Sequence, residues 1–409
     1  MEETATRDDA QRNALRLIVT NLLANGHTTQ GTIAAVQDAS RRWGLDLDVV
    51  PNWDHTLLVN RANGQVYLDV PTSPTAVNMH VVAETKRTLT SSSDEAEDLG
   101  PTLSQHSKLK PYSDPVFALA CMTGATALAI IFGSRQPLEL AIIAVVAGIG
   151  GLVRRQLGRF HVSLVGQALG AALIAGITAS AVHAGSTANL SLLVALCPAM
   201  VLVPGPHLLN GLLDLAGLHI GIGIGRLTYA LTILAAICAG LILGLIATGG
   251  LPPSNAAVNE PTILVDTAAA AVAGASYSVY FGLRPRHLIW PVAIGAIAHV
   301  VRYVLLYQLD YNGAVAAFAA CLVTGLLLTP VAHRMHLPFA GIGFASVVAL
   351  VPGVLVFRAT SGIVELANSP TTDLLLATSS DLPNALLTML AMGAGLVIAH
   401  RLAGRWWVR

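Results

Sequence analysis

Asn210 and Asp214 stand four residues apart, directly after Pro204 and Gly205 in an apolar segment. This spacing places both side chains on one face of a helix. An amide and a carboxylate that face a cavity can bind an ammonium group, and the carboxylate can also take up a proton. Asp214 could instead lie solvated at the end of its helix, and both interpretations stay open.

A second apolar segment has the same break, because Pro352 and Gly353 again follow Leu-Val, and Arg358 takes the place of Asn210. Membrane helices tolerate such breaks where they are buried in protein or line a cavity. The amides at the start of a half-helix favour a carboxylate. Arg358 could meet such a carboxylate or a lipid phosphate. The predicted substrate site comprises Pro204, Gly205, Asn210, Asp214, Pro352, Gly353 and Arg358.

Asp266 and Arg302 are charged residues inside two consecutive apolar segments that a short turn joins. Charges inside a membrane are costly and are normally paired, so we predict an ion pair between them. The pair could be structural, or it could form a gate or proton relay. His299 shares a helix face with Arg302 and is either a core histidine or a proton carrier. The candidates for proton coupling or gating are Asp214, Asp266, His299 and Arg302.

Other motifs that could suggest an enzyme lack the necessary context. The glycines between Gly221 and Gly225 have neither a preceding strand nor a P-loop lysine. The four cysteines lie in apolar segments without a CxxC spacing, and the N-terminal histidines show no spacing of metal ligands. We therefore predict no metal, no cofactor and no enzymatic activity.

The composition indicates a polytopic membrane protein embedded in a lipid bilayer. Only 11% of the 409 residues are charged and the mean hydropathy is +0.64, too apolar for a soluble surface of this size. The formal net charge is zero, which gives no reason to expect a nucleic-acid partner.

Ten apolar segments are long enough to predict membrane spans, although several are shorter than an untilted crossing needs. The fourth and the ninth contain the two Pro-Gly breaks. The predicted spans are 115–132, 138–153, 162–182, 190–215, 227–248, 262–281, 288–306, 313–328, 339–366 and 384–402.

The region before the spans has a different pattern. Residues 1–90 predict a small α+β domain, and residues 91–114, rich in Ser, Asp, Glu and Pro, predict a linker that can include one short helix. Apolar periodicity favours helices at 12–24 and 29–43. Alternating residues favour strands at 46–50, 55–60 and 65–70, the last two joined by an Asn63-Gly64 turn.

Arginine placement predicts the orientation in the membrane. With the N-terminus in the cytoplasm, ten arginines of the loops and C-terminal tail face inside and two, Arg135 and Arg358, face outside. The N-terminal region also lacks the apolar core of a signal peptide. We therefore predict that both termini lie on the cytoplasmic side of the plasma (inner) membrane.

An internal repeat divides the membrane region. Phe132-Gly133 matches Phe281-Gly282, Val153-Arg154 matches Val301-Arg302, and the two Leu-Val-Pro-Gly breaks match, all at offsets of 148 or 149 residues. An odd number of spans in each half inverts one half relative to the other, as in many secondary transporters. We predict two inverted five-helix repeats, 115–250 and 251–409, with the substrate site between them.

The chain also resembles the threonine/serine exporter family. The matching motifs are residues 22–29, 44–45 and 81–89 in the N-terminal region, Val203-Pro204-Gly205 with Asn210, Asp214 and residues 225–227, and Val351-Pro352-Gly353 with Phe357-Arg358. Residues 91–113 match loosely, and Phe357 stands where the family pattern has tyrosine. The resemblance implies export of small hydroxy amino acids driven by protons, whereas split two-subunit relatives are linked to dicarboxylates.

The sequence thus predicts a secondary active transporter that exports threonine and serine from the cytoplasm by proton antiport and alternating access. The partners expected are a small amino-acid substrate, protons and lipid, and a homo-oligomer is compatible with this plan. The alternatives are a dicarboxylate (succinate-like) exporter of the same fold, a membrane enzyme and a passive channel.

Overall fold

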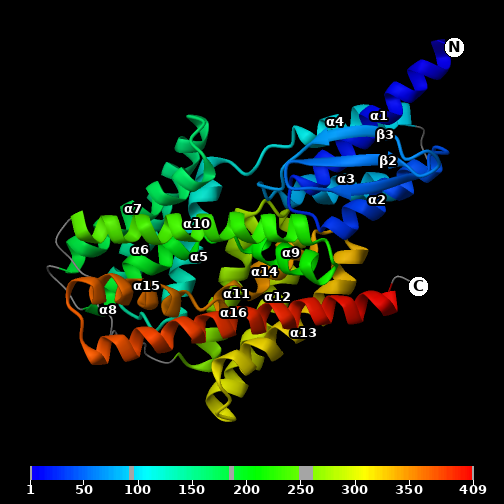
Figure 1. Ribbon diagram of the computed structural model, residues 1–409. Helices are drawn as coiled ribbons and strands as arrows, with labels where there is room; N and C mark the ends of the chain where they lie inside the picture. Colours follow the sequence, from blue (N-terminus) through cyan, green and yellow to red (C-terminus); the bar gives the residue numbers. More distant parts are fainter. Residues whose placement is uncertain (1, 92–95, 184–187, 248–260, 408–409) are drawn as a thin grey trace.

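The computed structural model describes residues 2–91, 96–183, 188–247 and 261–407, and it consists of a small α/β domain and a bundle of long helices (Figure 1). The α/β domain comes first in the chain and packs against one end of the bundle. Its elements are α1 (Glu2–Leu23), α2 (Thr29–Arg42), β1 (Leu47–Pro51), β2 (His55–Asn60), β3 (Val66–Pro71), α3 (Met79–Ser91) and α4 (Ala96–Ser107).

The three strands form an antiparallel sheet in the order β1-β2-β3. The predicted strands are confirmed within one residue at each end. Gly64 has φ +71° in the turn between β2 and β3, a conformation that glycine adopts at little cost. The domain core lies between the sheet and the helices and includes Leu15 and Ile18 of α1 with Val36 of α2.

The helices of this domain extend further than the sequence patterns predict. α1 begins ten residues before the predicted start, and α3 was not predicted as a helix. α4 lies within the predicted linker, yet Leu99 and Leu103 are buried in the domain core and Asn21 of α1 donates a hydrogen bond of 2.9 Å to the Leu103 carbonyl. The part of this segment from Ala96 to Ser107 is therefore a helix packed into the domain.

The bundle contains eight helices among the described residues that are long and apolar enough to cross a membrane, or ten spans if each of two bent helix pairs is one span. The predicted fold class is thus confirmed as a mainly helical chain with a small sheet near the N-terminus. The bundle elements are α5 (Asp114–Ile131), α6 (Pro137–Arg159), α7 (Leu164–His183), α8 (Ala188–Met200), α9 (Gly205–Ala216), α10 (Ile220–Ala247), α11 (Ile263–Tyr280), η1 (Pro285–His287), α12 (Ile289–Tyr303), η2 (Val304–Gln308), α13 (Gly313–Arg334), α14 (Phe339–Val347), η3 (Val348–Leu350), α15 (Gly353–Asn368) and α16 (Thr372–Trp407).

The two bent pairs are the segments that the Pro-Gly breaks predict. Leu190–Met200 and Gly205–Ala216 meet at 58°, and Phe339–Leu350 and Gly353–Ala367 meet at 67°. The backbone at the two prolines is nearly the same, with φ −81° and ψ 54° at Pro204 and φ −78° and ψ 52° at Pro352. Both breaks therefore use one local geometry.

Other matched positions share special backbone geometry as well. Gly133 and Gly282 have φ of +93° and +80° after the first helix of each half. His161 and Asp310, 149 residues apart, have φ of +60° and +55° after the second. Positive φ is uncommon outside glycine, so its recurrence at equivalent non-glycine positions is a specific likeness between the halves.

Corresponding helices also pack closely in each half. A Cβ on Gly244 of α10 would lie 2.5 Å from the Leu173 carbonyl oxygen of α7, and a Cβ on Gly395 of α16 would lie 2.5 Å from the Phe318 carbonyl oxygen of α13. Small residues allow membrane helices to approach this closely.

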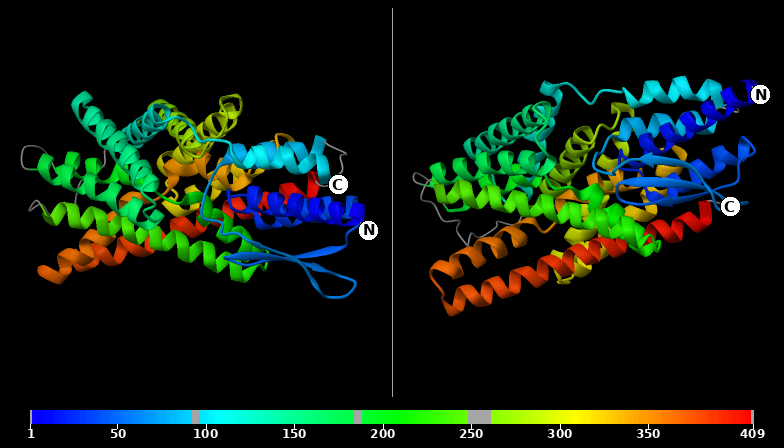
Figure 2. Two further views of the ribbon diagram at one scale, coloured as in Figure 1. Left: turned by 90° about the horizontal axis from the view of Figure 1, so that it is seen from above. Right: turned by 45° about the horizontal axis from the view of Figure 1, so that its top comes forward.

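The far end of α16 returns to the end of the bundle that carries the α/β domain (Figure 2). The N-terminal domain and the C-terminal end of α16 therefore lie at the same end of the bundle. The orientation of that end in the membrane stays a prediction.

Candidate functional site

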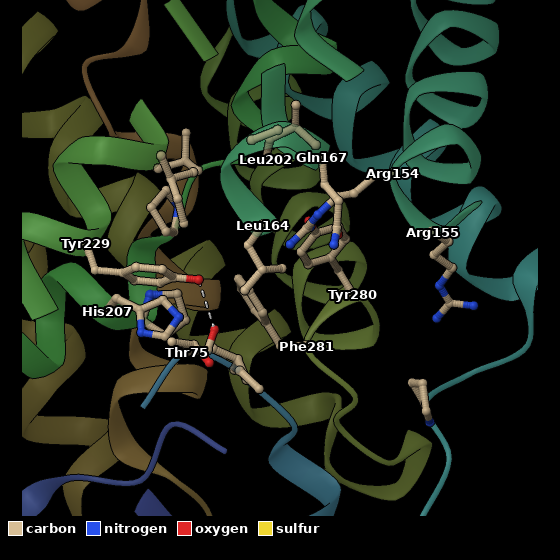
Figure 3. Close-up of a pocket in the computed structure, with 18 of the residues that line it drawn as sticks. Thr75, Arg154, Arg155, Leu164, Gln167, Leu202, His207, Tyr229, Tyr280 and Phe281 are labelled. Atoms are coloured by element: carbon tan, nitrogen blue, oxygen red, sulfur yellow. Dashed lines mark hydrogen bonds between the residues drawn. The ribbon is translucent and has the colours of Figure 1, made fainter. Parts of the chain in front are cut away.

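A cavity of about 280 Å³ lies beside the first helix break, next to the α/β domain (Figure 3). Its walls come from α5, α6, α7, α10 and α11, from the break at residues 202–206, and from residues 75–77 between β3 and α3. The cavity therefore connects the helix break with the N-terminal domain. Its polar side chains are Thr75, Arg154, Arg155, Gln167, His207, Tyr229 and Tyr280.

Tyr229 and His207 form one side of the cavity. The Tyr229 hydroxyl donates a hydrogen bond of 3.3 Å to the Thr75 carbonyl, drawn in Figure 3. The His207 ring packs edge-on against the Tyr229 ring, with centroids 5.2 Å apart. The Trp53 ring of the α/β domain also contacts Tyr229, with centroids 5.5 Å apart. These contacts join the cavity wall directly to the N-terminal domain.

Arg154 and Tyr280 form the opposite side. The guanidinium carbon of Arg154 lies 5.3 Å from the centre of the Tyr280 ring, and the buried Tyr280 hydroxyl has no hydrogen-bond partner among the described residues. Arg155 differs, because it donates hydrogen bonds to Asp114 at 2.9 Å and to the Tyr112 carbonyl at 2.7 Å. Figure 3 shows Arg155 set apart from the group around Arg154.

The two glycines of the predicted site pack against the opposite halves of the bundle. Pro204 lines the cavity, but a Cβ on Gly205 would lie 1.9 Å from the Phe344 ring of α14. A Cβ on Gly353, which follows Pro352, would lie 2.8 Å from the Met200 sulfur of α8. Each break therefore lies against the first half-helix of the other broken span.

Asn210 and Asp214 lie between α9, α10 and the N-terminal domain. Asn210 donates a hydrogen bond of 2.9 Å to the Gly26 carbonyl. Asp214 lies 3.1 Å from Arg226, and Arg226 donates a hydrogen bond of 3.2 Å to the His27 carbonyl. All three side chains are buried. The structure thus places them at the corner that follows α1, and none of them lines the cavity of Figure 3.

Arg358 of α15 forms an ion pair of 3.0 Å with Asp381 of α16. Arg358 therefore pairs with a carboxylate of the protein itself, whereas the sequence suggested a substrate carboxylate or a lipid phosphate. This contact ties the second half-helix of the ninth span to the last span.

The predicted ion pair between Asp266 and Arg302 is wrong, because Asp266 pairs with His299 instead. The His299 Nδ1 and Asp266 Oδ2 atoms lie 2.9 Å apart, and both side chains are completely buried. His299 lies about one turn earlier on α12 and faces α11. The short turn between the two helices predicts only that their side chains approach, and it does not decide which of two neighbours on one face of α12 makes the contact.

Arg302 forms no ion pair with any carboxylate that the structure describes. The second polar atoms of the pair, Asp266 Oδ1 and His299 Nε2, are also buried without a hydrogen-bond partner in the described chain. The candidates Asp266 and His299 therefore form one buried site in which one polar atom of each side chain lacks a hydrogen bond within the described chain.

Two family models match the chain. Residues 17–247 match a model described as a threonine/serine exporter, and residues 266–401 match a second model, threonine/serine exporter ThrE. The chain belongs to the threonine/serine exporter family. This confirms the resemblance seen in the sequence. No curated protein and no solved structure matches the chain.

The first ThrE family match ends with α10 and the second begins within α11, close to the division that the predicted repeat places at residues 250 and 251. The first match includes the cavity residues of α6, α7 and α10, and the second includes Asp266 and His299. The exporter family assignment makes this a multi-pass membrane protein whose family exports threonine and serine.

The sequence analysis of this ThrE-family chain missed the polar residues of the cavity, and among them is the charged Arg154 that it assigned to a loop. The second span was predicted to end at Val153, so Arg154 was assigned to a loop, whereas α6 continues to Arg159. Two signals could have found it. No helix-breaking proline follows Val153, and the repeat aligns Arg154 with Arg302, which was recognised as intramembrane.

The exporter's N-terminal domain also contacts the second half of the bundle. The Met79 amide of α3 donates a hydrogen bond of 2.9 Å to the Phe281 carbonyl. Glu84 accepts hydrogen bonds from Arg284 at 2.8 Å and from Arg286 at 3.2 Å. Together with the contacts of Asn210 and Arg226, the domain holds both halves at one end.

We expect this second contact to depend on pH. Burial raises the pKa of Glu84, but the hydrogen bond from Arg284 and the nearby arginine charges outweigh it, so the pKa lies below its ordinary value of 4.5. A lowered pKa means that the contact is stabilised above the ordinary pKa and lost as the pH falls through the folded value. Glu84→Gln should therefore weaken docking by about 1 kcal/mol at neutral pH, since the arginines are partly exposed.

The measurement is hydrogen exchange of the α3 amides in the full-length protein between neutral and acid pH. The variant should exchange faster at neutral pH and lose the acid dependence of the wild type. Glu97→Gln, the same change at an exposed carboxylate of α4, is the control. Equal exchange in Glu84→Gln and the wild type would show that this ion cluster does not hold the domain.

Proposed function

We propose that the protein exports the small hydroxy amino acids threonine and serine from the cytoplasm by proton antiport, with alternating access between two inverted five-helix halves. The observation that carries this proposal is the reciprocal packing of the two helix breaks. Gly205 lies against Phe344 and Gly353 lies against Met200, so each broken helix contacts the other half at the point where it bends.

The inverted-repeat plan gains support from the matched backbone geometry. Equivalent positions share the bend at Pro204 and Pro352, the positive φ at Gly133 and Gly282, and the close glycine contacts between corresponding helices. Transporters with broken helices near a repeat interface bind their substrates there.

The access side follows from the position of the cavity. Residues 75–77 of the N-terminal domain form part of its wall, so in the predicted topology it lies toward the cytoplasm. This is the conformation in which an exporter receives its substrate. Both termini then lie on the cytoplasmic side of the plasma membrane, as the arginine distribution predicts.

Proton coupling requires a titratable group inside the bundle, and Asp266 with His299 is the best candidate. The two groups touch each other, are fully buried and lie in the second half. Asp214 is less suited to this role, since Arg226 already compensates its charge.

The decisive experiment is transport of labelled L-threonine into vesicles that contain the purified protein. An acidic lumen should drive accumulation of threonine above the external concentration, and collapse of the pH gradient with an ionophore should abolish it. Equilibration without accumulation would indicate a passive channel, and absence of threonine flux above that of empty vesicles would contradict the proposed substrate.

A further inference from the structure

Arg154 lies beside the cavity, and no carboxylate of the described residues compensates its positive charge. It forms no ion pair with any carboxylate in the described chain, whereas Arg155 and Arg159 on the same helix both pair with Asp114, at 2.9 and 2.7 Å. Charges in a membrane protein are normally paired with another group or with a ligand. The planar guanidinium presents several N–H donors that match a carboxylate.

The surroundings of Arg154 narrow the ligand to one with a single carboxylate. Tyr280 lies beside the guanidinium, and its buried hydroxyl has no partner among the described residues and can donate to a carboxylate oxygen. The other arginine of the cavity, Arg155, is already paired with Asp114. Among the described residues that line the cavity, Arg154 is therefore the cation left to balance a carboxylate, and a dicarboxylate would leave its second charge uncompensated.

The rest of the cavity suits the remaining parts of a small amino acid. The described residues that line the cavity include no Asp or Glu, so an ammonium group would rest against the ring of Tyr229 and the backbone at the helix break. The volume of about 280 Å³ is just below the usual range for ligand pockets, about 300–1,000 Å³, so the ligand must be small. These features suit a small zwitterion.

We propose that Arg154 binds the α-carboxylate of a small zwitterionic amino acid in the cavity beside the first helix break, with the Tyr280 hydroxyl as a second donor. This proposal rests on the proposed transport function and names the residue that recognises the substrate class.

The experiment measures binding of labelled L-threonine to the full-length protein in lipid vesicles, with competition by L-threonine methyl ester and by succinate. The wild type should prefer threonine to the ester, which lacks the negative charge, and should bind succinate more weakly. Arg154→Gln should lower threonine affinity at least about tenfold and reduce the preference over the ester. Arg154→Lys keeps the charge but lacks the paired N–H donors of the guanidinium. Its threonine affinity should lie between those of the wild type and Arg154→Gln.

Arg159→Gln is the matched control, because it removes the same charge from the same helix outside the cavity and should leave threonine affinity unchanged. A merely structural role of Arg154 would weaken threonine and the ester equally and leave their ratio intact, which would overturn the proposal. Equal binding of the ester and threonine by the wild type would also overturn the proposal, and this test needs no variant. Tighter binding of succinate would overturn the single-carboxylate assignment, and absence of threonine binding to the wild type would instead contradict the proposed function itself.

Discussion

Gly205→Ala is expected to abolish transport and to destabilise the folded protein more than the same change at any other break position. The added Cβ would lie 1.9 Å from Cε2 and 2.0 Å from Cζ of Phe344, so the ring of a rigid side chain in α14 must move. Overpacking of this kind costs about 1–3 kcal/mol. Because Phe344 belongs to the other half, the displacement also disturbs the contact between the halves on which alternating access would depend.

A graded series separates this steric cause from a general sensitivity to alanine. Gly353→Ala would meet the Met200 sulfur at 2.8 Å, and a flexible methionine can yield, so its effect should be smaller. Gly221→Ala meets nothing within 4 Å and should transport as the wild type does. The measurements are threonine transport in vesicles and thermal unfolding of the same samples.

A second-site change tests the contact with Phe344 directly. Phe344→Ala removes the ring that Gly205→Ala would displace, so the double variant should regain stability relative to the glycine variant alone. If the double variant is no more stable, the clash with Phe344 is not the cause. If Gly353→Ala lowers stability as much as Gly205→Ala does, the difference in rigidity between Met200 and Phe344 does not determine the loss.

The sequence was informative where local chemistry determines structure. The Pro-Gly pairs break their helices because proline lacks a donor, and the two breaks have nearly the same φ and ψ because the same residues form them. The Asn63-Gly64 turn is also a local effect, because Gly64 adopts the positive φ that the turn requires at little cost. Apolar length predicts the spans, although it gives their ends less well, as α6 beyond Val153 shows.

The side-chain contacts between distant segments could not be predicted in this way. Asn210 and Asp214 share a helix face as expected, but only the fold shows that this face meets Gly26 and His27, almost two hundred residues earlier. Spacing gives the face of a helix and says nothing of what packs against it. The candidate site therefore required the structure, above all to place Arg154 in the cavity.

The N-terminal domain gives a further reason why the site escapes local reasoning. It contributes Thr75 to the cavity wall and holds both halves of the bundle through Asn210, Arg226 and Glu84. A part of the chain with the composition of a soluble domain thus takes part in a site at the helix break. Composition distinguishes the N-terminal domain from the helical bundle, and only the packing shows that both contribute to one cavity.

Asp266→Asn is expected to abolish accumulation of threonine driven by a pH gradient while threonine exchange across the vesicle membrane continues. Asparagine keeps the shape of the side chain but cannot take up and release a proton. Exchange needs only substrate binding and the conformational change, whereas accumulation also needs the proton. Loss of both activities in a well-folded variant would assign Asp266 to the transport cycle as a whole and contradict a specific role in coupling.

The same pair makes an energetic prediction that identifies the partner. Removing one member of a buried pair leaves the other uncompensated, at a cost of about 3–5 kcal/mol, whereas removing both costs less. Asp266→Asn and His299→Gln should therefore each destabilise the protein more than the double variant does, a coupling that unfolding measurements report. Arg302→Gln is the matched control, because Arg302 lies on the same helix and does not contact Asp266. Additive losses for Asp266 and His299, or a coupling energy between Asp266 and Arg302 instead, would show that the 2.9 Å contact is not the one that compensates the buried carboxylate.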